Sequence, residues 1–392
     1  MMEYTYPSMI VLGATGSVGM QALDVADAHG VRVDAISANR SVEQTEQLVR
    51  RHRPKACAMA DENCAKDLAV RLLDLPVKVY AGSDGICDMI TETSTDAERQ
   101  VVVNSILGQA GLAPTMATLQ AGKQLALANK ESLVVAGELV MPLAKEKGID
   151  ILPVDSEHCA IYQCLRSGQA KEIKRIMLTA SGGPFYGYSR EQLEHVTLQK
   201  TLAHPTWNMG AKITVDSASM MNKGFEVIEA VHLFGVKPEQ IEVTVHRESI
   251  IHSAVEYIDN NVIAQLSVPD MRSCVQYALT HPLRTEASIK QLDWFEVGKL
   301  TFDRPDPQTF ILLQLAFDCI AAGGALPAVL NAANEICVAA FLKQKLSFCG
   351  IMDTVAKVVS DMKYAADCHT LEDILACDSA ARQKAQSYLH NQ

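Results

Sequence analysis

Short apolar runs alternate with segments of helical apolar spacing over roughly the first 150 residues. Residues 8–12 predict a buried strand, Met20–His29 a helix and Val31–Ser37 a second strand. A helix is expected after Ser41, and further strands are predicted at Ala56–Ala60, Val77–Ala81, Val101–Asn104 and Leu125–Ala128. Strands and helices that alternate at this spacing form a parallel, doubly wound sheet. We therefore predict an α/β domain over residues 1–154.

The pattern changes after Asp150. Later strands are predicted at Arg175–Thr179, Lys212–Val215, Glu242–His246 and Ile263–Ser267, with helices between them. This order predicts a central α+β catalytic domain over residues 155–289. Within it, the glycine- and proline-containing segment 184–210 is typical of a lid loop, because long loops are uncommon inside compact domains.

The last part of the chain has an almost entirely helical pattern. Residues 290–315, with Pro305 and Pro307, predict a linker, and residues 316–392 predict a C-terminal α-helical domain. Helices are expected at Phe310–Ala322, Pro327–Lys343 and Thr354–Met362. A chain of 392 residues has room for two or three domains at about 100–200 residues each.

Composition narrows the class of protein. The formal net charge is −11, so a broad surface that neutralises nucleic-acid phosphates is not expected. Eleven scattered cysteines without a CxxC pair favour reduced, mostly buried thiols in a cytoplasmic protein. No apolar run reaches the length of about 18 residues that a membrane span requires. Met1–Pro7 lacks the basic and apolar regions of a signal peptide.

A glycine-rich turn follows the first predicted strand and opens the first helix. It reads Gly13-Ala14-Thr15-Gly16-Ser17-Val18-Gly19, a GxxGxxG variant of the dinucleotide-binding loop. The glycines allow the backbone to approach a pyrophosphate closely, and the helix N-terminus then faces the phosphate charge. This context predicts a Rossmann-type nucleotide-binding domain, with a packing turn in an ordinary α/β domain as the alternative.

The end of the second predicted strand bears on the choice of cofactor. An NAD enzyme usually places Asp or Glu there to bind the ribose 2′-hydroxyl, whereas this chain has Ser37-Ala38-Asn39-Arg40-Ser41. Arg40 offers a charged fork for a 2′-phosphate, which favours NADP(H). The alternative is that Arg40 is a solvated surface arginine.

Two carboxylates, Asp155 and Glu157, stand where a predicted strand ends and a helix begins. Carboxylates at the carboxyl end of a strand can converge on one hard cation. Taken alone, the pair is better explained as acidic residues that favour a helix N-terminus.

A second polar group follows Val215, where a strand is expected to run into a helix. Asn222, Lys223 and Glu226 then share one helical face, because they are three and four residues apart. An amide, an ammonium and a carboxylate beside Ser217 suit a phosphate and a metal-bound oxygen. A surface salt bridge of little energetic value is the alternative.

Two loop segments extend this polar group. Ala180–Pro184 follows a predicted strand and suits a small nest of backbone N–H groups. His204–Gly210 lies in the expected lid, where Trp207 can close over a ligand and exclude water. The alternative is a loop anchored by packing of Trp207, with His204 unliganded.

With these motifs in place, the chain resembles the 1-deoxy-D-xylulose 5-phosphate reductoisomerase family. The matching blocks occur in the family's order and span nearly the whole chain. They are residues 13–19, 126–134, 153–158, 179–185, 204–210, 215–226, 249–253, 269–272 and 330–335.

The resemblance implies a set of site residues. The implied metal ligands are Asp155, Glu157 and Glu226. The implied substrate-binding residues are Lys130, Ser156, Glu157, Ser181, His204, Ser217, Asn222, Lys223 and Glu226. The implied cofactor-binding residues are Thr15, Gly16, Ser17, Val18, Asn39, Arg40, Ser41, Asn129, Glu131 and Gly210. The implied catalytic residues are Lys130, Glu157, His204 and Lys223.

The resemblance also implies the activity and its requirements. The reaction would be the NADPH-dependent rearrangement and reduction of 1-deoxy-D-xylulose 5-phosphate to 2-C-methyl-D-erythritol 4-phosphate, a step of isoprenoid precursor biosynthesis. It would need a divalent cation such as Mn²⁺, Mg²⁺ or Co²⁺, and the protein would be a homodimer.

The chain departs from the family's usual pattern in a few places. Ala14 and Ser41 replace Ser and Asn, which are mild changes. Arg247-Glu248 stands where Pro-Gln is more usual and adds one charge of each sign near the expected site.

Two other functions remain open on the residues alone. Another NADP-dependent dehydrogenase with a GATGxVG loop would need a cysteine nucleophile. A non-enzymatic NADPH sensor would need neither the carboxylates nor the lid.

Overall fold

The computed structural model describes residues 6–94, 99–207 and 209–390. Met1–Thr5, at the start of the segment considered for a signal peptide, lies outside these ranges, as does Asn208 of the expected lid motif. None of the described helices combines the length and the hydropathy needed to cross a membrane.

The chain divides into two compact units. The first comprises Met1–Ser132, Val140–Cys159 and Asp270–Lys290. The second comprises Leu133–Leu139, Ala160–Pro269 and Gln291–Gln392. These units cut across the domain boundaries expected at 154 and 289, and the three-domain division stays a prediction.

The segment 270–290 belongs to the first unit because it packs on the first sheet's helices. The Arg99 guanidinium donates to the carbonyls of Leu279 at 2.8 Å and His281 at 3.1 Å. Helix α12 (Arg272–Thr280) also packs against α1 (Ser17–His29).

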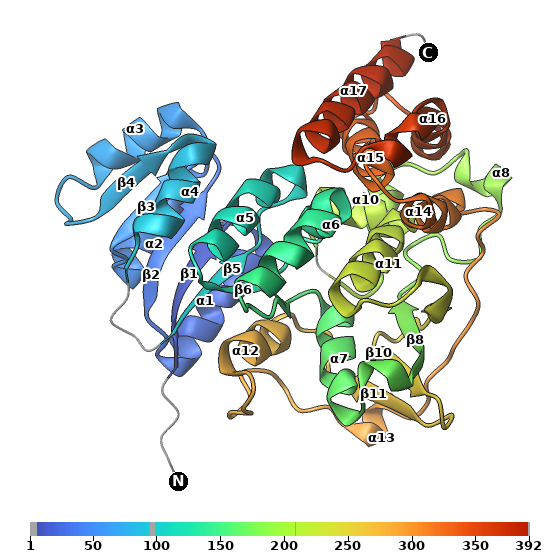
Figure 1. Cartoon of the computed structure of the whole chain (residues 1–392), viewed down its shortest axis with the longest axis horizontal. Helices are drawn as coiled ribbons and strands as arrows, with labels where there is room; N and C mark the ends of the chain where they lie inside the picture. The colour runs from blue at the N-terminus through green and yellow to red at the C-terminus, as the bar shows by residue number, and fades with distance from the viewer. Residues whose placement is uncertain (1–5, 95–98, 208, 391–392) are drawn as a thin grey trace. The chain divides into compact units, whose positions relative to one another are not determined.

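The first unit is built on a seven-stranded sheet in which all neighbouring strands are parallel (Figure 1). Its order is β4-β3-β2-β1-β5-β6-β7, which confirms the predicted doubly wound sheet. The strands are β1 (Ser8–Leu12), β2 (Val33–Ala38), β3 (Ala56–Met59), β4 (Lys78–Ala81), β5 (Gln100–Asn104), β6 (Gln124–Leu127) and β7 (Leu152–Pro153). The strand order reverses between β1 and β5, where ligands bind in folds of this type.

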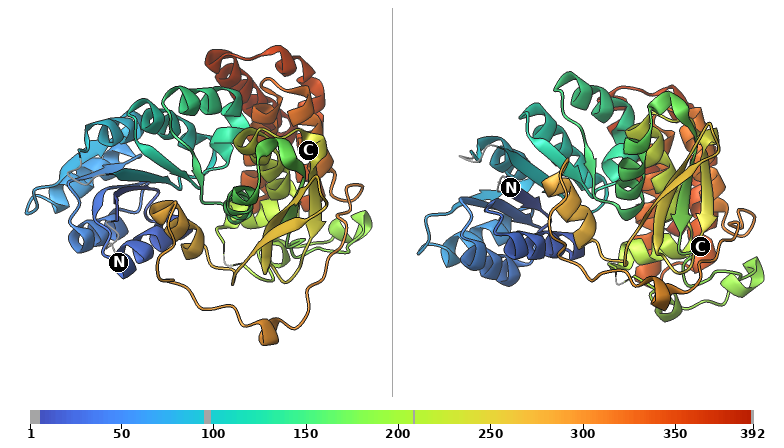
Figure 2. Two further views of the ribbon diagram at one scale, coloured as in Figure 1. Left: turned by 60° about the horizontal axis from the view of Figure 1, so that its bottom comes forward. Right: turned by 90° about the horizontal axis from the view of Figure 1, so that it is seen from below.

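The helices of the first unit cover both faces of the sheet (Figure 2). Helix α2 packs against α3 and α4 against α5, as right-handed crossovers on either side of the switch point require. The bounds are α2 (Val42–His52), α3 (Glu62–Arg71), α4 (Gly82–Glu92), η1 (Gly108–Gly111), α5 (Leu112–Gln120), α6 (Glu131–Glu146) and α7 (Ser156–Cys164). Only the middle of α6, Leu133–Leu139, belongs to the second unit, whereas α7 passes into that unit at Ala160. Helix α6 is kinked at Ala136.

The central strands are buried along their whole length because both of their faces are covered. Every residue of β1, β2 and β5 is buried. Ile10, Leu12 and Val102 form one cluster with Met89 and Ile90 of α4. At about 25 cal/mol per Å² of buried apolar surface, this burial is the main stabilising contribution to the sheet.

The second unit contains a four-stranded sheet of order β11-β10-β8-β9. Its strands are β8 (Ile173–Ala180), β9 (Ile241–Val245), β10 (Ile251–Tyr257) and β11 (Val262–Leu266). Strands β8 and β9 are parallel, whereas β10 is antiparallel to both β8 and β11. Strand β10 was not predicted, because its buried positions include the polar residues His252, Ser253 and Glu256.

One predicted strand, Lys212–Val215, is wrong. These residues lie in α10 (Ala211–Ala218), which is followed after a short turn by α11 (Met221–Phe234). Its β-branched Thr214 and Val215 suggest a strand, but the Thr214 hydroxyl bonds the Gly210 carbonyl one turn earlier at 2.9 Å. The helical spacing predicted for Asn222, Lys223 and Glu226 is confirmed.

The C-terminal residues form the predicted helical region. Helix α15 packs against α10, α14, α16 and α17, and α11 packs against α14. The longer helices are α14 (Ile311–Ala322), α15 (Leu326–Leu342), α16 (Phe348–Asp361) and α17 (Leu371–His390). The short helices of the second unit are η2 (Leu165–Ser167), η3 (Ala170–Glu172), α8 (Arg190–Leu193), α9 (Leu198–Thr201), η4 (Pro238–Gln240), α13 (Trp294–Val297) and η5 (Lys363–Asp367).

Candidate active site

The glycine-rich loop joins β1 to α1 at the switch point of the sheet. Gly13 has φ +76°, and a Cβ there would meet the Ser105 carbonyl oxygen at 2.9 Å. A Cβ on Gly19 would meet the Gly13 carbonyl oxygen at 2.2 Å, so α1 lies too close to the loop for any side chain. The loop backbone is tied to β2 through the Ala14 N–H and the Ser37 carbonyl at 2.8 Å.

The residues expected at the pyrophosphate are accessible. Gly16 and Ser17 are exposed, and Thr15 and Val18 are partly exposed. Gly16 precedes α1 and offers no side chain to cap its first N–H groups. This turn therefore leaves room and unsatisfied donors for an anion.

The end of β2 carries Asn39, Arg40 and Ser41, all of which are exposed. Arg40 Nε lies 3.0 Å from Asp61 Oδ2, with 76% of its side chain exposed. Asp61 also accepts from the first N–H groups of α3, which holds its pKa below the usual range. Arg40 is therefore a mostly solvated side chain that pairs with Asp61 at the protein surface, and its role towards a 2′-phosphate stays a prediction.

Two residues predicted near the cofactor have structural roles. Asn129 is buried, and its amide donates to the carbonyls of Ile106 at 2.6 Å and Gly108 at 2.9 Å. It also donates to Glu131 Oε2 at 3.1 Å and accepts from the Ser132 N–H at 3.0 Å. These bonds fix the loop after β5, so Asn129 shapes this edge of the first unit.

Lys130 and Asp155 form an ion pair at the carboxyl ends of adjacent strands. Lys130 follows β6, and Asp155 follows β7. Lys130 Nζ lies 2.5 Å from Asp155 Oδ2, with both side chains largely buried. The next residues begin α7, where the Ser156 hydroxyl donates to Glu157 Oε2 at 2.5 Å. Parallel strands that end at one sheet edge thus bring these four predicted residues together.

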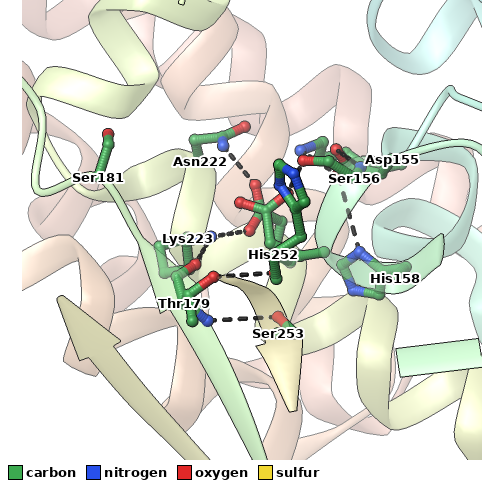
Figure 3. A network of polar contacts seen from close by, with 12 residues as sticks. Asp155, Ser156, His158, Thr179, Ser181, Asn222, Lys223, His252 and Ser253 are labelled. Carbon is green, nitrogen blue, oxygen red and sulfur yellow. Dashed lines mark hydrogen bonds and ion pairs between the residues drawn. The ribbon is translucent and has the colours of Figure 1, made fainter. Parts of the chain in front are cut away.

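In the second unit, Lys223 and Asn222 of α11 both bind the carboxylate of Glu226. The ammonium of Lys223 pairs with Oε2, and the amide of Asn222 donates to Oε1. Lys223 Nζ also donates to the Thr179 carbonyl at 2.5 Å (Figure 3). Glu226 and Lys223 are buried, so this pair is no surface salt bridge.

Thr179 ties this network to the sheet. Its hydroxyl donates to the His252 carbonyl at 2.8 Å, and its N–H donates to the Ser253 hydroxyl at 3.3 Å (Figure 3). Both acceptors lie in β10. Lys223 is therefore held by the end of β8, whose own position is fixed by the neighbouring strand.

Ser181, His204 and Ser217 lie around the turn after β8. His204 Nε2 is 3.0 Å from Ser181 Oγ. Gly182 and Gly183 have φ +76° and +65°, and a Cβ on Gly183 would meet the Ser217 carbonyl oxygen at 2.9 Å. The turn thus packs against the end of α10, and the nest of backbone N–H groups predicted there stays a prediction.

His204 is a neutral hydrogen-bond donor. Its Nδ1 accepts from the N–H groups of Thr206 at 3.2 Å and Trp207 at 2.9 Å, so Nε2 carries the proton. Burial, with a smaller effect of Arg247, lowers the His204 pKa to about 4. Gly210, predicted to contact the cofactor, is exposed immediately before α10.

Sequence analysis missed Asp216. It is buried, and its carboxylate accepts from Asn334 of α15 at 2.7 Å and lies 3.0 Å from Lys212 Nζ. This bond shows that Asn334 packs α15 onto α10 next to Ser217. Two buried polar residues that are far apart in the sequence form no local pattern that would predict their contact. One of them, Asn334, does lie in the segment 330–335 that resembles the family.

Several of the cysteines are unsuited to nucleophilic catalysis, because burial raises their pKa. All are free. Burial raises the pKa of Cys57, Cys319 and Cys337 to about 12, so these thiols stay protonated at neutral pH. The pKa values of Cys64 and Cys87 are also raised by burial.

Comparison with known protein families gives matches along the chain. Residues 9–137 match the family model of 1-deoxy-D-xylulose 5-phosphate reductoisomerase. Residues 151–234 match the C-terminal domain model of 1-deoxy-D-xylulose 5-phosphate reductoisomerase, and residues 266–384 match a second C-terminal domain model, of DXP reductoisomerase.

Curated proteins of the same description are similar over nearly their full length. The 1-deoxy-D-xylulose 5-phosphate reductoisomerase of Phocaeicola vulgatus is 47% identical, over 97% of this chain and 98% of its own. That of Bacteroides fragilis is 46% identical, over 99% of this chain and all of its own.

Solved structures give the same result. The reductoisomerase of Zymomonas mobilis in complex with NADPH aligns with a TM-score of 0.90 and 40% identity, over 99% of this chain and 100% of its own. A reductoisomerase in complex with NADPH, fosmidomycin and magnesium aligns with a TM-score of 0.92 and 37% identity, over 98% of both chains.

Proposed function

The chain belongs to the 1-deoxy-D-xylulose 5-phosphate reductoisomerase family, and we propose how its own residues carry out the family's reaction. It is an NADPH-dependent oxidoreductase that requires a divalent cation and converts 1-deoxy-D-xylulose 5-phosphate to 2-C-methyl-D-erythritol 4-phosphate. The buried Lys223–Glu226 pair beside the Ser181–His204 contact is the observation that best supports the assignment of residues below.

NADPH is proposed to bind along the switch point of the first unit. Its pyrophosphate would meet Thr15, Gly16, Ser17 and Val18, where the glycine positions leave space that a side chain would fill. Asn39, Arg40 and Ser41 would receive the 2′-phosphate. Arg40 Nε is occupied by Asp61, so its terminal guanidinium nitrogens are the donors that remain for a phosphate.

The family resemblance assigns the nicotinamide end of NADPH to Asn129, Glu131 and Gly210. Asn129 supports this assignment indirectly, because its bonds to the loop after β5 set the shape of the surface there. Glu131 accepts from the Asn129 amide and begins α6.

Asp155, Glu157 and Glu226 are proposed as the ligands of the cation. Three carboxylates form the hard oxygen set that Mg²⁺ or Mn²⁺ prefers. Lys130 and Asn222 orient two of these carboxylates through the contacts described above. When bound, the cation supplies Lewis-acid polarisation of the substrate's oxygens and NADPH supplies the hydride.

The substrate's phosphate is proposed to bind in the second unit. The Ser181 and Ser217 hydroxyls, the Asn222 amide and the turn after β8 offer donors, and Lys223 offers charge. His204 donates from Nε2 without carrying charge itself, because its pKa is about 4. Since the phosphate is remote from the reacting carbons, its binding energy can be used to close the lid and exclude water.

The reacting end of the substrate is proposed to lie beside Lys130, Ser156 and Glu157. Lys130 is a buried ammonium within 2.5 Å of Asp155, so it can stabilise negative charge that develops on a substrate oxygen. Ser156 can donate a hydrogen bond once Glu157 has another partner.

Neither alternative function is favoured by an observation on this chain. A dehydrogenase with a cysteine nucleophile would need a lowered thiol pKa, whereas burial raises the thiol pKa of Cys57, Cys319 and Cys337. A mere NADPH sensor would not need the buried carboxylate network of α11.

We also infer a homodimer in the cytoplasm. Eleven free cysteines suit a reducing compartment. Exposed apolar side chains in the second unit, Val262 on the edge strand β11 and Trp294 and Phe295 in α13, suit a surface covered by a second copy. Light scattering on the purified protein tests this state, and a monomer at micromolar concentration would contradict it.

The activity is tested by following NADPH oxidation with 1-deoxy-D-xylulose 5-phosphate after chelator treatment. Oxidation is expected only when Mn²⁺ or Mg²⁺ is restored. Folded protein that binds NADPH but never oxidises it with this substrate would contradict the proposed function.

A further inference from the structure

Arg247 and Glu248, which stand where the family usually has Pro-Gln, contact different partners. Glu248 Oε1 accepts from the Thr301 hydroxyl at 2.7 Å, and Oε2 lies 3.1 Å from His246 Nδ1. Although burial opposes it, these contacts hold the Glu248 pKa below its usual range. Arg247 contacts neither of these groups. The two charges are therefore not a mutually neutralising surface pair.

Arg247 instead reaches the turn after β8. Its guanidinium donates to the Gly183 carbonyl at 3.4 Å, and its Cζ lies 4.8 Å from the centre of the Tyr186 ring. In the part of the chain that the structure describes, Arg247 forms no ion pair. Stacking on tyrosine orients the planar guanidinium while leaving its positive charge uncompensated.

The same turn carries the proposed phosphate contacts. Gly183 is two residues after Ser181, which bonds His204 at 3.0 Å. The positive charge of Arg247 also reaches this imidazole, since it adds to burial in lowering the His204 pKa. Arg247 is thus close enough to the turn to act on an anion bound there.

The other basic side chains assigned to the phosphate carry little free positive charge. His204 is neutral, and the ammonium of Lys223 is shared with Glu226 and the Thr179 carbonyl. Glu248 accepts from the Thr301 hydroxyl and Asp303 is hydrogen-bonded to Tyr186, so both carboxylates keep their charge but form these contacts rather than an ion pair with Arg247. A phosphate dianion at this turn would therefore meet the guanidinium of Arg247, which no ion pair neutralises among the described residues.

We propose that Arg247 is a specificity-determining residue that binds or steers the substrate's phosphate at the Ser181–Gly183 turn. This inference rests on the proposed function, which places the phosphate there. The ligand chemistry is a phosphate monoester or phosphonate dianion, for which a guanidinium is a geometrically matched partner. Arg247 takes no part in the reduction, so its contribution lies in substrate affinity.

The test compares Arg247→Met, which keeps an apolar stem over Tyr186, with Arg247→Lys, which keeps the charge. Arg284→Met is the matched control, because Arg284 also stacks on a tyrosine, with its Cζ 5.1 Å from the centre of the Tyr277 ring. For Arg247→Met we expect KM for 1-deoxy-D-xylulose 5-phosphate to rise on the order of ten-fold with kcat within about two-fold. Arg247→Lys should retain most of the affinity.

Inorganic phosphate provides a readout that needs no turnover. We expect phosphate to raise the thermal unfolding temperature of the wild type and Arg284→Met more than that of Arg247→Met. KM and phosphate protection of Arg247→Met equal to those of the wild type would overturn the proposal, as would equal losses in Arg284→Met. Phosphate protection that depends on Arg247, in a protein without reductoisomerase activity, would contradict the proposed function but not the anion site.

Discussion

The two units position their functional groups by different physical means. In the first unit, the loop of residues 13–19 is shaped by the backbone, because Gly13 and Gly19 stand where no Cβ fits. In the second unit, Lys223 and Glu226 are positioned by side chains that satisfy one another inside the protein. The first site depends on glycines, which leave room for the backbone. The second depends on charged side chains that pair with one another and are hydrogen-bonded.

This difference determines what each site tolerates. A backbone-shaped loop fails when volume is added, whereas a buried charge network fails when a single charge is removed. Removing one partner of a buried pair leaves the other without compensation, which costs more than the pair contributes. Substitutions that add volume to one unit and remove charge from the other therefore sharpen the comparison.

The largest effect is expected from Glu226→Gln. The substitution keeps the shape but removes the carboxylate proposed to bind the cation and leaves the Lys223 ammonium uncompensated. We expect kcat/KM to fall on the order of a thousand-fold, with a higher Mn²⁺ requirement, since a metal ion supplies several kcal/mol of stabilisation. Steady-state kinetics against Mn²⁺ concentration measure both.

Glu335→Gln is the control for this experiment. Glu335 pairs with Arg382 at 2.8 Å and accepts from the Asn331 amide at 3.1 Å, and it is not among the proposed ligands. It should keep its activity and metal dependence. Unchanged metal dependence in Glu226→Gln would remove Glu226 from the ligand set.

An intermediate effect is expected from Gly19→Ala. Its methyl group would lie 2.2 Å from the Gly13 carbonyl oxygen, so the loop or α1 must move. We expect KM for NADPH to rise by about ten-fold and stability to fall by about 1–3 kcal/mol, as for other overpacked sites. NADPH titration and denaturant unfolding measure the two quantities.

Gly30→Ala, at the other end of α1, is the control that distinguishes a distorted glycine-rich loop from a general loss of stability. Gly30 has φ +64°, but a Cβ there would meet nothing within 4 Å. We expect a loss of about 1 kcal/mol from backbone strain and no change in KM for NADPH. Equal effects of both alanines on NADPH would contradict the backbone explanation.

The smallest effect is a dependence of the stability on pH that comes from His204 in the second unit. The loop of residues 13–19 in the first unit has no titratable side chain and contributes no such dependence. The native His204 stays neutral down to about pH 4, whereas an unfolded imidazole takes up a proton below about pH 6.5. The unfolded state therefore binds more protons between these values. Stability present above pH 6.5 is lost as the pH falls towards 4.

We expect the wild type to lose more stability than His204→Gln when the pH falls from about 7.5 to 5. The difference should be less than about 1 kcal/mol, because the imidazole is partly solvated and its interactions are screened. Guanidinium chloride unfolding at the two pH values measures it. The same decline in both proteins would mean that another group is responsible.

The fold of the first unit was largely predictable, because central strands such as β1 and β5 contain a continuous run of buried apolar residues. Both faces of β1 and β5 are covered, and the glycine loop marks where the first strand ends. In the second unit, burial of polar residues obscures the pattern. Strand β10 carries the buried residues Ser253 and Glu256, and the latter is compensated by Lys174 and Arg175 from the adjacent strand β8.

The candidate site was predictable where its residues are close in sequence. Asn222, Lys223 and Glu226 meet because helical spacing brings them together. The contact of Asp216 with Asn334 was not predictable, because the two residues are 118 positions apart and only the fold unites them. The strand predicted at Lys212–Val215 failed because local β-propensity was outweighed by helix packing against α11 and α15.

The bond between Asp216 and Asn334 has a consequence for the order in which the enzyme becomes complete during its synthesis. Residues 181–226 emerge from the ribosome long before α15, yet the buried Asp216 carboxylate lacks its amide donor until Asn334 has emerged. The strands of the first sheet all precede residue 154 and can begin to pair earlier. We therefore expect that in a nascent chain halted before α15 the strands around the glycine-rich loop have formed, whereas the proposed phosphate site is still incomplete.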